Sequence, residues 1–94
     1  MTATADSHLR ELARRLVWWQ DADATLADER RFLAQAMTWA NWEEMEFVRS
    51  VFGDAALRSV LENAPPGVFD GRSWNYWHAR FGMLPPPPLP RRRI

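Results

Sequence analysis

The residues best suited to chemistry lie at the C-terminal end of the chain, where Leu84 and a run of prolines precede three arginines. Prolines lack a backbone N–H and hold φ near the polyproline II value, which excludes an α-helix or a central β-strand. Planar guanidinium groups bind carboxylates and phosphates through paired hydrogen bonds. We therefore expect residues 84–94 to form an extended tail that contacts an anionic partner.

Partner-binding residues are predicted in two places. The tail contributes Pro87, Leu89, Pro90, Arg91, Arg92 and Arg93. The spacing Pro87-x-x-Pro90-x-Arg92 matches a polyproline ligand with a flanking cation. The second place is formed by Tyr76 and Arg80, which stand one helical turn apart and can stack on each other or on a partner.

Residues for catalysis or metal binding are scarce. The only histidines are His8 and His78, and the chain has no cysteine, no Gly-x-Ser-x-Gly turn and no glycine-rich phosphate loop. The acidic cluster formed by Glu43, Glu44 and Glu46 is interpreted as a solvated helix N-terminus. We therefore expect a protein that is not an enzyme and that carries no metal and no cofactor.

Charge is unevenly distributed along the 94 residues, although the formal net charge is zero. Without the three C-terminal arginines, nine arginines face twelve acidic residues, so the body is −3 and the tail is +3. This makes nucleic acid the less favoured partner. No apolar run is long enough to cross a membrane and no signal-peptide core is visible, so we expect a cytoplasmic protein without a membrane partner.

Apolar periodicity and capping residues predict an all-α fold. Helices are expected from residue 7 to about 20, 25 to 40, 41 to 53, 54 to 64 and 70 to 82. Their expected caps are Asp6 or Ser7, Thr25 in a capping box with Asp28, Asn41, Asp54, and Asp70 or Ser73. We predict a compact single domain of four to five short helices: residues 1–6 are a flexible N-terminus, 7–83 the helical domain and 84–94 the tail.

Six tryptophans are many for a chain of this length. The helical spacing of Trp74, Trp77 and Phe81 predicts that these three residues are part of the core. One of Trp18 and Trp19 is expected to be partly exposed, because adjacent helical residues point in different directions.

Three segments of the chain resemble a family of small bacterial proteins encoded beside nucleotidyltransferase toxins of the AbiEii type. The first runs from Asp28 to Met37 and into Trp42-Glu-Glu. The second is Val51-Phe-Gly-Asp54 followed by Leu57, Val60 and Leu61. The third runs from Ala64 through Asp70 and Arg72 to His78, and ends in Pro-Pro-Leu-Pro-Arg-Arg. Together they span about residues 26–93.

The resemblance implies an antitoxin that binds and neutralises a nucleotidyltransferase. Such enzymes hold Mg²⁺ and nucleotide with clustered carboxylates, and Arg91–Arg93 would pair with that acidic rim. The chain has no winged-helix segment of the kind some antitoxins use to bind operator DNA.

The sequence leaves two alternatives open. The chain is either a nucleic-acid-binding accessory protein that uses its arginines and exposed tryptophans, or a structural interaction module whose tail packs on its own body, against Trp74 or Trp77. The sequence leaves the oligomeric state open.

Overall fold

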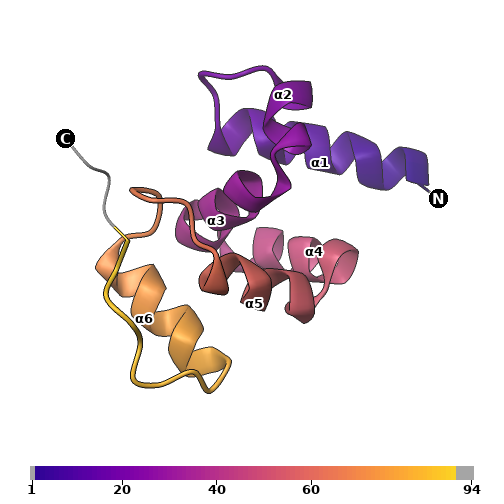
Figure 1. Ribbon diagram of the computed structural model, residues 1–94. Coiled ribbons are helices and arrows are strands. Elements are labelled where there is room, and N and C mark those ends of the chain that lie inside the picture. Colours follow the sequence, from indigo (N-terminus) through magenta and orange to yellow (C-terminus); the bar gives the residue numbers. More distant parts are fainter. Residues whose placement is uncertain (1, 91–94) are drawn as a thin grey trace.

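A computed structural model describes residues 2–90, with side chains from Ser7 onward; Arg91, Arg92, Arg93 and Ile94 lie outside the described residues. Within this range the chain forms six α-helices and no β-strand, which confirms the all-α prediction (Figure 1). The helices are α1 (Thr2–Leu16), α2 (Ala22–Ala27), α3 (Glu29–Trp39), α4 (Trp42–Phe52), α5 (Asp54–Glu62) and α6 (Gly71–Arg80).

The expected count of four to five helices is wrong, because the helix predicted from Thr25 to about Ala40 is two helices. Asp28 separates them: it ends α2 and begins α3, where its side chain accepts a hydrogen bond from the backbone N–H of Arg31. The capping box predicted for Thr25 and Asp28 is absent. The Thr25 hydroxyl instead donates to Gln20, and Asp21 caps α2.

The first helix lies earlier in the sequence than expected. α1 begins at Thr2, ahead of the cap predicted at Asp6 or Ser7, and it ends at Leu16. Trp18 and Trp19 therefore belong to a turn, which is closed by a hydrogen bond from the Gln20 N–H to the Val17 carbonyl.

Two of the other predicted caps are confirmed and one is wrong. Asn41 forms a full capping box with Glu44, and the Asp70 side chain accepts from the Ser73 backbone N–H at 2.8 Å. Asp54 caps nothing, because Gly53 holds the N-cap position of α5. The Asp54 carboxylate pairs with Arg49 instead, at 2.9 Å.

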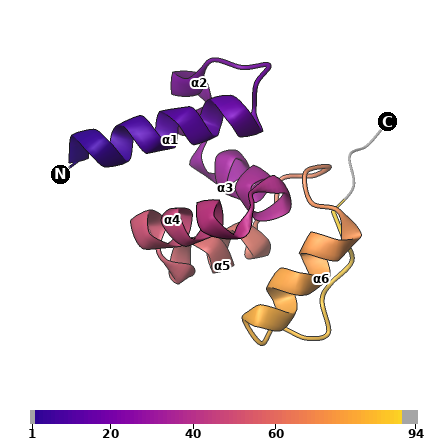
Figure 2. The ribbon, with the colours of Figure 1, turned by 180° about the vertical axis from the view of Figure 1, so that it is seen from behind.

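Helix α3 is the centre of the fold and contacts each of the other five helices. Figures 1 and 2 show α1 and α2 on one side of α3 and α6 on the other, with α4 and α5 packed beneath it. The face of α3 that makes these contacts is apolar: Phe32, Leu33, Ala34 and Ala36 are almost completely buried. Burial of such side chains is the main source of stability in a domain of this size.

The chain reverses direction after α6. Gly82 adopts φ +69°, a conformation that favours glycine, and the backbone N–H of Met83 donates to the carbonyl of His78 at 2.8 Å. Residues 84–90 then run back alongside α6, as both ribbon views show (Figure 2). None of the helices between residues 2 and 90 combines the length and apolar character that a membrane span requires.

Candidate functional site

The proline-rich segment lies against α6 and the loop that precedes it. The indole N–H of Trp74 donates to the carbonyl of Pro87 at 2.8 Å, and the backbone N–H of Gly67 donates to the carbonyl of Pro90 at 3.3 Å. Leu89 is half-buried against the core. Residues 84–90 are therefore packed on the chain's own body, as one of the alternatives from the sequence anticipated.

Buried aromatic side chains form the surface beneath this segment. Trp74 is 4% exposed and packs edge-on against Phe69 and against the ring of His78. His78 is fully buried, and its Nδ1 donates to the Trp74 carbonyl at 2.7 Å, whereas its Nε2 has no hydrogen-bond partner within residues 2–90. Trp74 and Trp77 belong to the core, as predicted, whereas Phe81, predicted with them, is only partly buried against it.

Tyr76 and Arg80 lie in a different place from the proline segment. They line a cavity of about 290 Å³ between α4 and α6, which we call the α4–α6 cavity. Arg80 donates to the Tyr76 hydroxyl at 3.4 Å, and its guanidinium lies 5.9 Å from the centre of the Trp77 ring. The two side chains are thus joined by a hydrogen bond, and the ring over which Arg80 lies is that of Trp77 and not that of Tyr76. No residue between 84 and 90 lines this cavity.

The rest of the α4–α6 cavity combines an apolar floor with charged groups. The floor includes Met37, Met45 and Trp77, and Trp42 stands at the edge with most of its surface exposed. Arg49 pairs with Asp54 and with Glu46. The hydrogen bond from Arg49 lowers the pKa of the Asp54 carboxyl, and partial burial opposes this shift. The positive charges of Arg49 and Arg80 lower the same pKa further.

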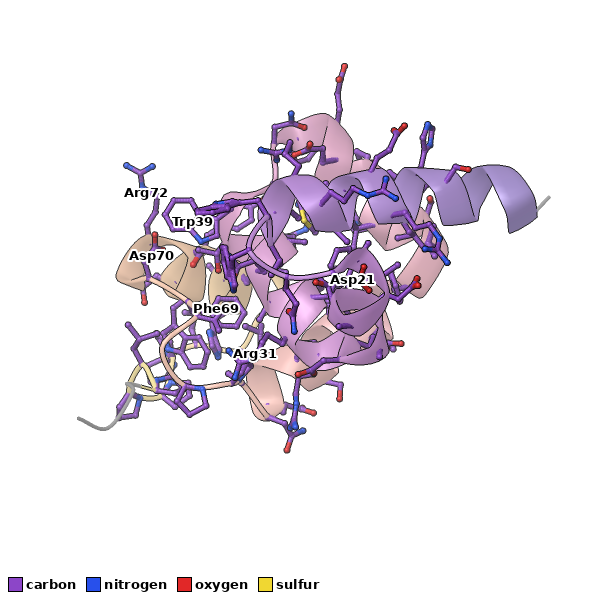
Figure 3. All side chains as sticks on the ribbon, turned by 90° about the horizontal axis from the view of Figure 1, so that it is seen from above. Asp21, Arg31, Trp39, Phe69, Asp70 and Arg72 are labelled. Carbon is purple, nitrogen blue, oxygen red and sulfur yellow. The ribbon has the colours of Figure 1, made fainter. Side chains whose placement is uncertain are left out.

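A second hollow, of about 370 Å³, lies where the end of α1 meets α3. It is lined by Arg15, Leu16, Trp18, Trp19, Gln35 and Trp39, and we call it the tryptophan hollow. Gln35 fixes its base by donating to the Leu16 carbonyl at 3.3 Å. Figure 3 shows Trp39 on the same side of the molecule as Arg72, which projects from the beginning of α6.

The sequence left open which tryptophans are exposed, apart from one of Trp18 and Trp19. Trp18, Trp19, Trp39 and Trp42 are exposed by 77%, 61%, 61% and 63%, whereas only one of the first pair was expected to be partly exposed. Trp18 and Trp19 pack edge to face with their ring centres 5.6 Å apart. Trp39 is the last residue of α3 and Trp42 is the first residue of α4, so both exposed side chains lie at helix ends.

Arg15, the charged residue that lines the tryptophan hollow, is already paired. The guanidinium of Arg15 makes two hydrogen bonds to the carboxylate of Glu44, which joins α1 to α4. Burial raises the pKa of Glu44, but the hydrogen bonds from Arg15 and from the Asn41 N–H outweigh it, so the net shift is downward. Within residues 2–90 no group of three or more acidic, histidine or cysteine residues is arranged to hold a metal ion.

Of the predicted partner-binding residues, the structure therefore places Pro87, Leu89 and Pro90 on one surface and Tyr76 and Arg80 in a separate cavity. Arg91, Arg92 and Arg93 lie outside the described residues. The chain matches no known protein family, and no curated protein or solved structure matches it.

Proposed function

We propose that the chain is a non-catalytic protein-binding module that acts as an antitoxin toward a nucleotidyltransferase-type toxin. One observation carries the binding part of this proposal: Trp18, Trp19 and Trp39 are each more than 60% exposed and line the same hollow of the folded body. Large exposed aromatic patches mark interaction surfaces, and tryptophan is the residue most enriched at the energetic centre of protein interfaces. The choice of toxin rests on the sequence resemblance.

In this proposal the tryptophan hollow and the arginines have different roles. Trp18 and Trp39 provide apolar area on rigid rings, so they supply most of the binding free energy. Arg91–Arg93 pair with the carboxylates that hold Mg²⁺ and nucleotide in the toxin, and so block its active site. The carbonyl of Pro90, the residue before these arginines, is bonded to Gly67.

The charge around the tryptophans favours a protein partner over a nucleic acid. Proteins that bind single-stranded nucleic acid place aromatic rings in a positively charged groove. The one cation that lines the tryptophan hollow is Arg15, and its guanidinium is already paired with Glu44. The net charge of −3 on the chain without its last three arginines adds repulsion against phosphates.

The proposal is tested by the neighbouring gene and by growth. The adjacent gene should encode a nucleotidyltransferase whose expression alone stops growth, and co-expression of this chain should restore it. The triple variant Arg91→Gln, Arg92→Gln, Arg93→Gln should fail to restore growth while it still binds the toxin through the tryptophans. Full neutralisation by this triple variant would contradict the role of the arginines, and an adjacent gene of another class would contradict the choice of partner.

The packing of residues 84–90 favours a second function for that segment, as a structural strap on the body. A truncation before Leu84 would remove both the strap and the arginines, and so would mix stability with binding. The glutamine variants avoid this, because they leave the bonds to Pro87 and Pro90 in place.

A further inference from the structure

The surface around Trp74 provides hydrogen-bond donors to the proline-rich segment that lies on it. A proline-rich segment offers backbone carbonyls as acceptors but hardly any N–H donors. Both hydrogen bonds here run from the body to the segment: Trp74 donates to Pro87 and Gly67 donates to Pro90. An indole N–H beside an apolar aromatic face is well suited to the carbonyls and rings of an extended proline-rich chain.

Partly buried side chains supply the apolar part of this contact. Leu89 is partly buried against the core and so are Pro86 and Pro90, whereas Pro87 and Pro88 are exposed and Leu84 is 61% exposed. The segment is thus held by its Pro87 and Pro90 carbonyls and by the partly buried residues Pro86, Leu89 and Pro90. The surface formed by Gly67, Phe69 and Trp74, which we call the Trp74 surface, therefore holds an extended segment of leucine and prolines.

We propose that the Trp74 surface is a receptor for extended Leu/Pro-rich segments and that the chain's own residues 84–90 occupy it as a built-in competing ligand. Any other segment of this chemistry must displace the tail, and any partner that takes residues 84–90 must first detach them. Tethering places the tail at an effective concentration of the order of millimolar, so it outcompetes a dilute free peptide. The apparent affinity for a free peptide falls in proportion to the fraction of surface left vacant.

The test uses the full chain and the heptapeptide Leu-Pro-Pro-Pro-Pro-Leu-Pro, with the indole ¹H–¹⁵N signal of Trp74 as the readout. Trp74→Phe identifies this signal, and the other five indoles report whether the fold is intact. Leu89→Ser releases the tail from the body. Leu84→Ser is the matched control in the same segment, because Leu84 is mostly exposed.

In Leu89→Ser the Trp74 signal should move toward the position of a solvent-exposed indole, and added heptapeptide should return it. The wild type and Leu84→Ser should need at least about ten times more peptide for half-saturation, because the tail occupies the surface. A heptapeptide carrying serine in place of its second leucine should not bind. Equal half-saturation in the wild type and in Leu89→Ser would overturn the proposal, and so would an unmoved Trp74 signal.

A second variant covers the case in which Leu89→Ser does not fold. Pro88→Gly leaves every bond to the Trp74 surface in place and raises the entropy that the tail loses on docking, by about 0.4–1 kcal/mol. The heptapeptide concentration that gives half-saturation should be about two- to fivefold lower than in the wild type. An unchanged concentration would count against the proposal. None of these readouts involves a toxin, so this proposal and the antitoxin proposal fail independently.

Discussion

The indole N–H of Trp74 and the carbonyl of Pro87 are joined by a 2.8 Å hydrogen bond that fixes the proline-rich segment on the body. Trp74 is at once a core residue and the donor that holds the tail. The bond satisfies the polar atom of a buried tryptophan and orders a segment that has almost no N–H donors of its own. Tail docking and core packing are therefore coupled through one side chain.

Replacing Trp74 by phenylalanine should lower the free energy of unfolding by about 1–2 kcal/mol, because one hydrogen bond and part of a buried ring are lost. Urea denaturation followed by circular dichroism measures this change. Trp19→Phe is the matched control: its ring is mostly exposed and should change stability by less than about 0.5 kcal/mol. Equal effects of the two substitutions would contradict the packing described for Trp74.

Trp77 forms a hydrogen bond to the last turn of α3. Its replacement should lower the free energy of unfolding more than the replacement of Trp74 does. Its indole donates to the carbonyl of Met37 at 2.8 Å. The helical donor for that carbonyl would be the N–H of Asn41, which donates to Glu44 instead. Trp77→Phe leaves a buried carbonyl unpaired and should cost about 2–4 kcal/mol in the same denaturation experiment. A cost below that of Trp74→Phe would contradict this account.

The sequence predicted the helical class and the caps at Asn41 and Asp70, because these depend on neighbouring residues, whereas the helix starts expected at residue 7 and at Thr25 are wrong. Asn41 and Asp70 were identified as caps since the donors they bind lie three residues away. The break at Asp28 was missed because an acidic residue suits both the N-cap and the first turn of a helix, and only packing decides. Here Ala22 and Thr25 are buried as α2 folds onto α1.

The candidate sites were harder to predict because they depend on contacts between distant residues. The prolines exclude helix for residues 84–90, but the donors that hold them come from Gly67 and Trp74. Helical spacing places Tyr76 beside Arg80, yet only the fold brings Trp42 to the same cavity. Likewise, the exposure of Trp18 depends on α1 ending at Leu16.

The cap at Asp70 should give a measurable dependence of stability on pH. The Ser73 backbone N–H, followed by the Ser73 hydroxyl, lowers the pKa of the Asp70 carboxyl. A carboxyl whose pKa is lower in the folded state stabilises the fold above its unfolded pKa, and this contribution is lost as pH falls through about 4 and below. Asp70→Asn keeps a good cap that does not titrate, so the variant should lose less stability between pH 6 and pH 3.

The residual acid sensitivity of Asp70→Asn should come from Asp54 and Glu44, whose pKa values are also lowered. The urea midpoint at pH 6 and pH 3 checks both statements. A pH dependence as steep in the variant as in the wild type would show that the Asp70 cap does not contribute.

Asn41 at the start of α4 and Asp54 at the start of α5 should contribute differently to the stability of the fold. Asn41→Ala removes a full capping box and should cost about 1 kcal/mol. Asp54→Ala should cost less, because Asp54 caps nothing and its pair with Arg49 is exposed to solvent. The midpoints of thermal unfolding of the two variants measure the difference. A larger loss of stability in Asp54→Ala than in Asn41→Ala would indicate that Asp54 does cap α5.

The affinity of the chain for the proposed nucleotidyltransferase partner, measured by calorimetry in the wild type and in the double variant Trp18→Ser, Trp39→Ser, is the most direct test of the proposed function. We expect the double variant to stay folded and to bind at least about 30-fold more weakly, as the loss of an interface hot spot implies. Val51→Ser, which removes another exposed apolar side chain, should bind as the wild type does. Unchanged affinity in the double variant would contradict the assignment of the tryptophan hollow as the binding surface.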